Sequence, residues 1–411
     1  MGSQGIVGTV QYRGQIVSTS LPSSSAVSSP SPSRPRHAVI IGGSLGGLFA
    51  GTMLRQIGWD VDIYERSASD LDSRGGGIVL QPEVLEVFRR IGVDIRRQAL
   101  GVPSINRVVL DKDGSVRVRR PAPQTQTSWS LIYSTLKSVF GSEHYHQGRV
   151  LSHVEQDPDS ARVTACFEDG SRASGDLLIG ADGGDSRVRS QFWPAQRPGY
   201  AGYLAWRGLL PEADMPATTR AVLHGDFGFA NHTGSHILGY LVPGEGNSIW
   251  PEQRLYNWVW YRVASEAMLE QVMLDRDGRQ RAYSVPEGLL APRWRQHLRE
   301  EAPQLLPPPF RDAVLATDAP FVQAIRDLAV EQMVSGRVLI LGDAASIPRP
   351  HTAASTLKAA ANALSLADAL QASPDDIDAA LARWEPRQVA LGQQLLRQGV
   401  EAGQLLLFHH P

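Results

Sequence analysis

The sequence contains almost no cysteine, and this limits the disulfides and metal sites that the chain can form. Its 411 residues include one cysteine, Cys166, within the apolar run VTACF. A single thiol cannot form a disulfide within the chain and offers no cysteine cluster to a metal, so no metal is expected. This cysteine usage fits a reducing compartment, and a cytoplasmic location is expected. We expect Cys166 to be a small buried residue of the core.

The chain also lacks an imbalance of charge and any long hydrophobic run. Its 40 Lys and Arg residues stand against 42 Asp and Glu residues, which gives a formal net charge of −2. Such a charge gives no global attraction to nucleic acid or to anionic membrane surfaces. No run is apolar enough to span a bilayer, and the N-terminus lacks the basic-then-apolar order of a signal peptide. We therefore expect no nucleic-acid partner and no membrane partner.

The first part of the sequence is poor in large apolar residues. Residues 20–35 read SLPSSSAVSSPSPSRP, with eight serines and four prolines in sixteen positions. A segment of this composition cannot bury enough surface to offset its conformational entropy. We predict that residues 1–36 form a disordered Ser/Pro-rich tail.

Regular structure is expected from residue 37 onward. The apolar run HAVII (37–41) is typical of a buried parallel strand; GGSLGG follows, then a segment with apolar residues at helical spacing, then the strand-like DVDIYE. Together they predict a βαβ unit of about thirty residues. Asp-Gly pairs at 113–114 and 169–170 predict two hairpins, and 128–140 is a candidate helix.

The middle of the chain has a different character. Residues 199–285 are rich in Tyr, Trp and Phe and contain strand-like runs such as LYNWVWYRV, which predict an antiparallel sheet. At RVLIL the parallel-strand pattern returns, and helical segments follow. We therefore predict an α/β fold with a discontinuous Rossmann-like domain (37–198 and 286–400), an inserted substrate-binding sheet domain and C-terminal helices. Residues 401–411 are expected to be a C-terminal tail.

The turn after the first strand nearly matches the dinucleotide-binding pattern, which has glycine at its first, third and sixth positions. Here these positions are Gly42, Ser44 and Gly47, and the hydroxyl of the serine could itself reach a phosphate. Glu65 ends the second strand, where a carboxylate can accept hydrogen bonds from a ribose. These features predict an adenine-dinucleotide site, although the motif alone also fits a plain glycine turn. Arg66 either reaches phosphate or is a solvated surface charge.

Two further segments are candidates for contact with the same ligand. RGGGIVLQP (74–82) contains three glycines that let a backbone pass close to a flat ligand, or else form a flexible loop. GADGGDSRVR places Asp182 and Gly183 at the end of a buried strand. The carboxylate there could orient ribityl or pyrophosphate groups; the alternative is ordinary turn chemistry.

The segment GDAASIPRPHTAAST follows the apolar run RVLIL. Asp343 lies at the carboxyl end of a predicted strand, where open α/β sheets bind ligands, and could accept hydrogen bonds from ribitol. A helix is expected to begin near Ser355, and its free N–H groups and dipole would favour a ring that becomes anionic on reduction. His351 suits proton transfer, although a lone histidine is more often structural.

Taken together, these motifs resemble those of the single-component FAD-dependent aromatic hydroxylases, the class A flavoprotein monooxygenases, over roughly residues 37–400. The motifs are GGSLGG with YER, GADGGDSRVR and LGDAA, in this order. The segments GIVLQPE, YAGYLAWRG, NWVWYR and GDAASIPRPH resemble the 2,6-dihydroxypyridine hydroxylase branch. The resemblance implies that NAD(P)H reduces bound FAD and that a flavin C4a-hydroperoxide formed with O₂ inserts one oxygen atom into an electron-rich aromatic or N-heteroaromatic ring.

The resemblance also implies roles for individual residues. His351 is the expected base beside the substrate, and Tyr203, Trp206 and Tyr240 are expected to line the substrate face, with core packing as their alternative. The expected partners are a small aromatic or N-heteroaromatic substrate and O₂, and a homodimer is possible. The expected contacts with FAD are Gly42, Gly43, Ser44, Leu45, Gly46, Gly47, Glu65, Arg66, Ile78, Val79, Val150, Asp182, Gly183, Gly342, Asp343, Ala353, Ala354 and Ser355.

Three positions depart from the family pattern. Most members carry glycines in the loop after GD, whereas residues 352–356 read TAAST, and the side chains of Ser355 and Thr356 could crowd the flavin. The acidic residue usual a few positions later is Asn362 here. The first-half helix, which often begins with an arginine, begins with Trp129.

These departures keep two alternatives open. One is a flavin-dependent epoxidase or oxidative tailoring enzyme that acts on a larger natural product. The other is a flavin-binding protein without catalysis, which the altered loop would favour. The presence of Gly42, Glu65, Asp182 and Asp343 argues for the hydroxylase, because loss of function would not preserve all of them.

Overall fold

The computed structural model describes residues 35–71, 76–95, 97, 99–157 and 161–408. Nearly all of the predicted tail therefore lies outside the described residues. Among the helices that the structure describes, none has the length and apolarity needed to cross a membrane.

The predicted βαβ unit is the centre of a six-stranded sheet. Strand β1 (His37–Ile41) pairs in parallel with β2 (Asp60–Tyr64) on one side and with β10 (Leu177–Gly180) on the other, and α1 (Leu45–Gln56) connects β1 to β2. Parallel strands are covered on both faces, which explains why β1 and β10 are almost entirely apolar. The strand order is β17 (Val334–Ser335), β18 (Val338–Ile340), β10, β1, β2, β6 (Tyr145–His146).

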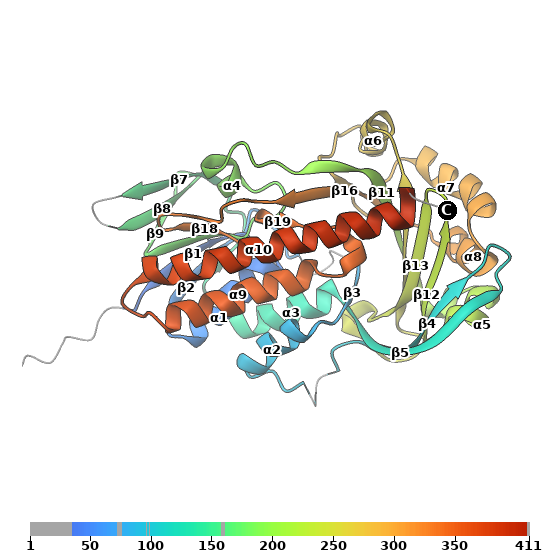
Figure 1. Ribbon diagram of the computed structural model, residues 1–411, viewed down its shortest axis with the longest axis horizontal. Coiled ribbons are helices and arrows are strands. Elements are labelled where there is room, and N and C mark those ends of the chain that lie inside the picture. The colour runs from blue at the N-terminus through green and yellow to red at the C-terminus, as the bar shows by residue number, and fades with distance from the viewer. Residues whose placement is uncertain (1–34, 72–75, 96, 98, 158–160, 409–411) are drawn as a thin grey trace, which may run out of the picture. The chain divides into compact units, whose positions relative to one another are not determined.

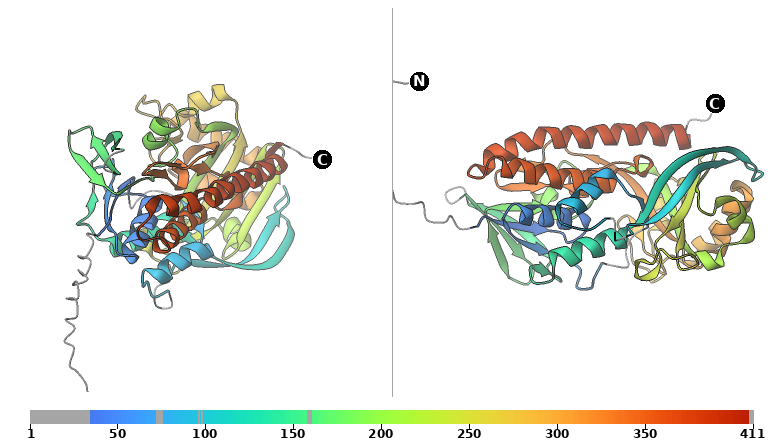
Figure 2. Two further views of the ribbon diagram at one scale, coloured as in Figure 1. Left: turned by 60° about the vertical axis from the view of Figure 1, so that its left-hand side comes forward. Right: turned by 90° about the horizontal axis from the view of Figure 1, so that it is seen from below.

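Helices and a small sheet cover this parallel sheet. On one face α9 packs between α1 and α10, and α3 packs on α1 (Figures 1 and 2). A hairpin sheet turns at 169–170 as predicted; its strands are β7 (Leu151–Asp157), β8 (Arg162–Phe167) and β9 (Arg172–Gly175). The helices are α1, α2 (Pro82–Arg90), α3 (Trp129–Phe140), α4 (Arg187–Phe192), α5 (Ala217–Leu223), α6 (Glu266–Val272), α7 (Pro292–Leu305), α8 (Pro308–Ala316), α9 (Ser355–Gln371) and α10 (Ile377–Gly403).

A ten-stranded sheet forms the other half of the molecule. All its pairings are antiparallel except that of β12 with β4. Its two faces are distinct because side chains alternate along each strand: one packs on α7 and α8, and the other faces the parallel-sheet half. Its strands, in order, are β15 (Ser284–Val285), β16 (Phe321–Ala329), β11 (Gly199–Pro211), β14 (Leu255–Val263), β13 (Ser235–Val242), β12 (Phe227–His232), β4 (Val102–Leu110), β5 (Val116–Ser128) and β3 (Gly77–Val79), with β19 (Ser346–Ile347) paired to β16.

The large sheet reaches beyond the range 199–285 that the sequence assigns to it. Strands from 77–128 join one edge through the parallel pair β12–β4, and residues 292–329 supply α7, α8 and β16. Periodicity identifies each of these as a strand or a helix but does not say which distant strand it pairs with. The long curved ribbon of β4 and β5 is plain in Figure 1.

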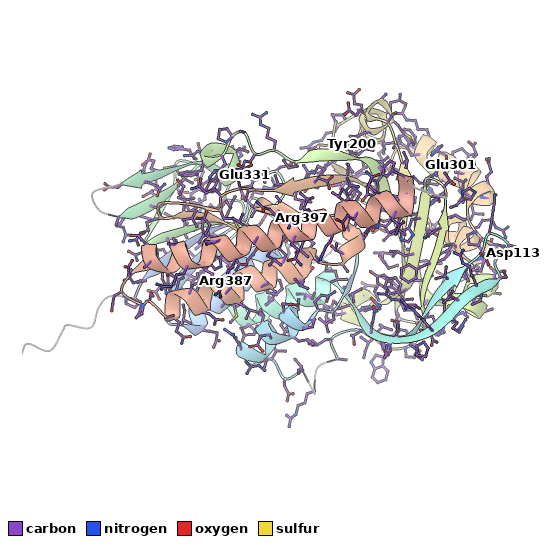
Figure 3. The ribbon with its side chains drawn as sticks, viewed as in Figure 1. Asp113, Tyr200, Glu301, Glu331, Arg387 and Arg397 are labelled. Carbon is purple, nitrogen blue, oxygen red and sulfur yellow. The ribbon has the colours of Figure 1, made fainter. Side chains whose placement is uncertain are left out.

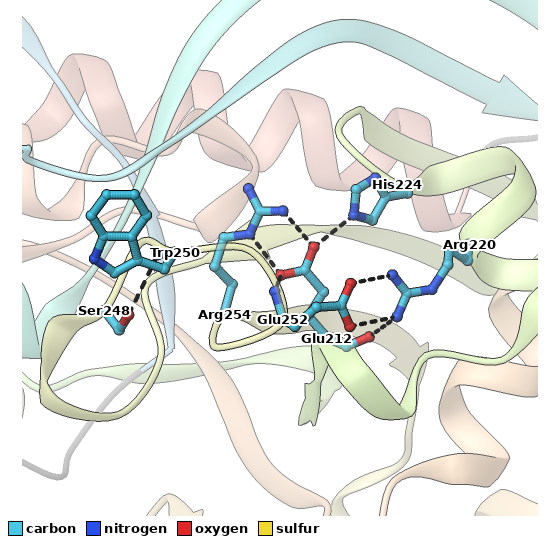
Figure 4. A network of polar contacts seen from close by, with 7 residues as sticks. All are labelled: Glu212, Arg220, His224, Ser248, Trp250, Glu252 and Arg254. Atoms are coloured by element: carbon cyan, nitrogen blue, oxygen red, sulfur yellow. Dashed lines mark hydrogen bonds and ion pairs between the residues drawn. The ribbon is translucent and has the colours of Figure 1, made fainter.

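A buried carboxylate fixes one end of this sheet (Figure 4). Glu212 follows β11 and is fully buried. It accepts hydrogen bonds from Arg254 Nε at 2.7 Å and from the backbone N–H of Glu252 at 2.8 Å, and it lies 2.6 Å from His224 Nε2. Burial raises the pKa of Glu212, but the bonds from Arg254 and His224 outweigh burial and lower the pKa to about 2. The carboxylate is therefore ionised, and its role is structural.

Helix α10 ends further along the chain than predicted. The sequence predicts a tail from residue 401, but α10 runs to Gly403 and a π-helical turn, η5 (Gln404–Phe408), follows it. The helix is amphipathic: Arg387 and Arg397 lie on its exposed face, as Figure 3 shows. Leu407 of η5 is buried among apolar residues of the large sheet. That non-local contact, which the short C-terminal sequence does not reveal, makes residues 401–408 part of the fold.

Candidate active site

A cavity of about 2150 Å³ lies between the two halves of the fold. Sites for single small ligands usually measure about 300–1,000 Å³, so the cavity has room for a large cofactor together with a second molecule. One wall comes from the turns at the N-termini of α1 and α9, and the other from the inner face of the large sheet. The ribbon of β4 and β5 and the glycine segment that includes Gly76 and Gly77 complete the lining.

The N-terminus of α1 is built to receive an anion. Ser44, its N-cap residue, lines the cavity, makes no side-chain cap hydrogen bond, and no acidic residue follows in the first turn. By contrast, Ser128, Ser265 and Asp376 each accept a backbone hydrogen bond at the start of α3, α6 and α10. Free N–H groups and the positive end of the helix dipole thus face the cavity, and they fit a pyrophosphate group. Arg66 lines the same region.

Glu65 lies directly behind this turn. It is buried, and its two carboxylate oxygens accept hydrogen bonds from the backbone N–H groups of Gly43 and Ser67, both at 2.8 Å. Gly43 itself has no space for a side chain, because a Cβ there would lie 2.2 Å from the hydroxyl of Tyr145. Glu65 thus fixes the glycine turn, and its role toward a ribose stays a prediction.

The N-terminus of α9 is another helix end at the cavity that lacks a side-chain cap. Its first turn contains no acidic residue, and Asp343 stands beside it. Asp343 Oδ1 accepts hydrogen bonds from Ser355 Oγ at 3.0 Å and from Lys358 Nζ at 2.8 Å, and Lys358 is 1% exposed. Asp343 therefore draws the Ser355 hydroxyl toward itself. Ala353 adopts the left-handed conformation, φ 52°, in the loop where the family pattern has glycines.

His351 lies where this loop meets the large sheet. Its Nε2 is 2.9 Å from the hydroxyl of Tyr203, and its ring contacts Tyr261 at a centroid distance of 4.8 Å. Its Nδ1 is buried without a hydrogen-bond partner. Burial, together with the nearby charge of Arg349, lowers the pKa of His351 to about 4. The imidazole is therefore neutral at pH 7, the state that a proton acceptor requires.

A second histidine, which no sequence motif marks, lies at this wall. His236 of β13 is buried, and its ring stacks on Tyr261 with an angle of 6° between the two rings. Burial, and the nearby charge of His351, lower the pKa of His236 to about 3. The alternation of β13 could have identified His236, because it shares a strand face with Tyr240, which was predicted to line the substrate side.

The registers of the large sheet arrange its inner face in rows. One row joins Arg207, Val259, Leu238, Phe229 and Val109 on five adjacent strands. The face is a mostly aromatic and aliphatic floor, to which arginines add positive charge. Its residues at the cavity include Arg107, Arg207, Phe227, Phe229, His236, Leu238, Tyr240, Val259 and Tyr261.

One predicted substrate residue points the other way. Trp206 is fully buried on the opposite face of the sheet, where its ring lies 6.1 Å from that of Trp294 in α7. Tyr203 and Trp206 are three residues apart on one strand, so their side chains lie on opposite faces. The prediction of Trp206 as a cavity residue is therefore wrong. Tyr203 is also fully buried and reaches the cavity through His351.

Asp182 acts at a helix rather than at the cavity wall. Its carboxylate accepts hydrogen bonds from Ser186 Oγ at 2.5 Å and from the backbone N–H of Arg187 at 2.7 Å, at the start of α4. Burial raises the pKa of Asp182, whereas these hydrogen bonds lower it. Asn362, at the position where the family has an acidic residue, accepts from the backbone N–H of Gly342 at 3.1 Å.

The structure therefore brings about half of the predicted site together at one surface. The predicted residues that line the cavity are Ser44, Arg66, Ile78, Val79, Tyr240, Asp343, His351, Ala353, Ala354 and Ser355. Those that do not line it are Gly42, Gly43, Leu45, Gly46, Gly47, Glu65, Val150, Asp182, Gly183, Tyr203, Trp206 and Gly342.

A Rossmann-like unit with anion-receiving helix ends, facing a cavity that a large sheet closes, defines a dinucleotide-dependent enzyme of the flavoprotein type. A family model described as FAD binding domain-like matches residues 200–327. The chain is 37% identical over 369 residues to 2,6-dihydroxypyridine 3-monooxygenase of Paenarthrobacter nicotinovorans, covering 90% of each protein. It is 27% identical over 377 residues to aurachin C monooxygenase/isomerase of Stigmatella aurantiaca, covering 89% of this chain and 88% of that protein.

The fold agrees with these relationships. The structure of 2,6-dihydroxypyridine-3-hydroxylase from Arthrobacter nicotinovorans superposes with a TM-score of 0.85 at 35% identity, covering 91% of this chain and 93% of that one. The chain belongs to the FAD-dependent aromatic hydroxylases. It is a flavoprotein monooxygenase that uses FAD and NAD(P)H.

Proposed function

We propose that the enzyme hydroxylates a small hydroxylated N-heteroaromatic ring of the hydroxypyridine type. The observation that carries this proposal is the neutral His351 at the edge of an aromatic floor, beside the N-terminus of α9. The relative that is 37% identical is named for the hydroxylation of 2,6-dihydroxypyridine. A flat ring with ionisable hydroxyl groups fits both the floor and the base.

The proposed cofactor contacts follow from the uncapped N-termini of α1 and α9. Ser44 and Arg66 would hold the pyrophosphate of FAD at α1, and Asp343 would accept from its ribitol chain. The loop of Ala353 to Ser355 would contact the flavin ring. FAD, when bound, supplies the oxygen-activating redox chemistry. The chain's own part is to orient the two molecules and to exclude water between its two halves.

In the proposed reaction His351 takes the proton of a substrate hydroxyl. An ionised oxygen makes the ring more nucleophilic, and a neutral imidazole within a buried wall is the acceptor. The hydroxyl of Tyr203 holds the Nε2 edge of the ring at 2.9 Å and leaves Nδ1 without a protein partner.

A second candidate is the oxidation of a larger natural product. The size of the cavity, about 2150 Å³, favours it, as does the likeness to aurachin C monooxygenase/isomerase. The two candidates predict different products, a ring with one added hydroxyl group or an epoxidised and rearranged skeleton. Mass spectrometry and NMR of the product distinguish them.

The test is NAD(P)H oxidation by the FAD-loaded enzyme with 2,6-dihydroxypyridine. We expect stimulated oxidation and a product that carries one ¹⁸O atom from ¹⁸O₂. The variant His351→Asn should keep its flavin absorption spectrum and lose about 10²–10⁴-fold in kcat, the usual contribution of a general base. If no hydroxypyridine or phenol stimulates NAD(P)H oxidation, the proposed function is wrong. If kcat is unchanged in His351→Asn, His351 is not the base.

A further inference from the structure

Two arginines meet across the strands that border the cavity. Arg107 of β4 and Arg120 of β5 are directly opposite each other in the register, and both side chains line the cavity. Like charges directly opposite on neighbouring strands destabilise a sheet. A pair of like charges on one face of this ribbon therefore destabilises the sheet unless an anion binds between the two arginines.

The two arginines lack the partners that their neighbours have. On the other face of β5, Arg117 pairs with Asp111 at 3.5 Å and Arg119 with Asp226 at 2.5 Å. Within the described residues, no carboxylate lies within ion-pair distance of Arg107 or Arg120. The Nε atom of Arg107 is also buried without a hydrogen-bond acceptor. The Nε atom is closed to a ligand, so an anion in the cavity would meet the Nη groups of Arg107 through charge-assisted hydrogen bonds.

The guanidinium group of Arg107 lies over the aromatic floor. It is 5.8 Å from the ring centroid of Phe227 and 5.7 Å from that of Phe229, and these two rings stack on each other at 4.3 Å. The guanidinium group therefore lies over β12, the strand next to its own strand β4. A flat ligand on the floor can place a substituent against this cation while its ring rests on apolar and aromatic side chains.

Two aromatic rings, those of Phe229 and His236, separate this cationic site from the base. Arg107 lies over Phe229, and the ring of Phe229 is 6.2 Å from that of His236. His236 and His351 adjoin each other, with ring centroids 5.8 Å apart. A substrate that ionises its hydroxyl at His351 can thus present a second anionic group toward Arg107 without placing both charges at one end of the cavity.

Resting on the hydroxylase function proposed above, we propose that Arg107 and Arg120 form a subsite for a carboxylate group of the substrate. The substrate class is then a hydroxylated aromatic or N-heteroaromatic acid rather than an unsubstituted hydroxypyridine. Arg107 makes the charge-assisted hydrogen bonds from within the cavity, and the more exposed Arg120 adds charge at its rim. The subsite determines specificity and takes no part in the chemical step.

The experiment compares an acid with its neutral isostere. Binding of 6-hydroxynicotinate and of 6-hydroxynicotinamide to the FAD-loaded protein is measured from the change in the flavin absorption spectrum. We expect the acid to bind at least about tenfold more tightly than the amide, with a preference that falls as salt is added. The double variant Arg107→Met/Arg120→Met should bind both with equal affinity.

The matched control is Arg117→Met, which removes the same charge from the other face of β5. Its ion pair with Asp111 is exposed and contributes little to stability, so this variant should keep the preference for the acid. The proposal is overturned if the wild type binds the acid and the amide with equal affinity or binds neither. It is also overturned if the double variant still prefers the acid. A double variant that changes the KM for NAD(P)H and leaves the affinity for the acid unchanged would instead assign the arginines to the phosphate groups of that molecule, and would equally overturn it.

The outcome is separable from that of the proposed function. An enzyme that hydroxylates 2,6-dihydroxypyridine but shows no preference for the acid retains the function and loses the subsite. A protein that binds the acid through Arg107 but oxidises no NAD(P)H in response retains the subsite and loses the hydroxylase. Circular dichroism and the retained flavin spectrum show that the double variant is folded.

Discussion

Two neutral histidines, His236 and His351, share the aromatic wall of the cavity. Burial lowers the pKa of His351 to about 4 and that of His236 to about 3, whereas a histidine in an unfolded chain titrates near about 6.5. Each therefore binds its proton more readily in the unfolded chain. Below pH 6.5 protonation favours unfolding, so the stability present above that pH is lost as the pH falls toward 4.

We predict a measurable loss of stability between pH 6.5 and pH 5. The free energy of unfolding should fall by up to about 1.4 kcal/mol per pH unit for each histidine that takes up a proton only on unfolding. The pKa of His37 is raised, chiefly by its hydrogen bond to Asp62, so its contribution is complete below pH 6.5 and does not produce this slope. Urea unfolding at half-unit steps of pH measures the slope. The variant His236→Asn should reduce it by about half, and an unchanged slope would show that His236 is protonated in the folded protein.

At the scale of single residues, the sequence predicts which residue types belong to the site better than it predicts where their side chains point. The types of Ser44, Asp343 and His351 in their motifs were enough to place all three at the cavity. Trp206 was misplaced because the prediction grouped aromatic residues without applying the two-residue period of a strand. His236 was missed because no motif marks it, and its importance comes from Tyr261 and His351, which reach it from other strands and loops.

Among the elements, the helix α10 is held close to the loop that carries His351. Its glycines leave no room for side chains there: a Cβ at Gly399 would lie 2.9 Å from the backbone N of Arg349, and one at Gly403 would lie 2.8 Å from Arg349 Nη1. Arg349 in turn pairs with Asp327 of β16 at 2.7 Å. The glycine face of α10 therefore sets the position of the loop from behind.

We predict that Gly399→Val displaces this loop. Forcing a side chain into a packed site typically costs about 1–3 kcal/mol, and the free energy of unfolding in urea should fall by that amount. The displaced loop should also lower the fraction of NAD(P)H that yields product. The control is Gln398→Val, the same new side chain at the exposed neighbouring position of α10. If both variants behave alike, helix propensity rather than the contact with Arg349 explains the effect.

The sequence predicts the helices and strands more completely than it predicts which strands pair. The βαβ unit, the two Asp-Gly hairpins and the antiparallel strands between residues 199 and 285 are all confirmed. The parallel pairing of β4 with β12 was not predicted, because strand pairing across more than a hundred residues leaves no periodic signal. That pairing brings Arg107 and Arg120 to the cavity.

For the whole molecule, the cavity between the two halves links cofactor binding to global stability. A ligand that binds the folded protein alone stabilises it by RT ln(1 + [L]/Kd), about 2.7 kcal/mol at a hundred times its Kd. FAD should therefore raise the midpoint of thermal unfolding of protein freed of flavin, by an amount that grows with its concentration. The fold was predictable from motifs because the phosphate turn is local; the volume of the cavity was not, because it depends on how the two halves pack.

The substitution Ser44→Asp tests whether the uncapped end of α1 is the pyrophosphate site. Aspartate is a good N-cap residue, so it should stabilise α1 itself by a fraction of a kcal/mol to about 1 kcal/mol while it presents a negative charge to the phosphates. We therefore predict an unchanged or raised melting temperature without FAD, and a loss of most of the FAD-dependent shift. Ser265→Asp, the same change at the N-cap of α6 on a helix that does not line the cavity, should keep the full shift. A full shift in Ser44→Asp would mean that the pyrophosphate binds elsewhere, because no repulsion between the new carboxylate and the phosphates would then have been felt.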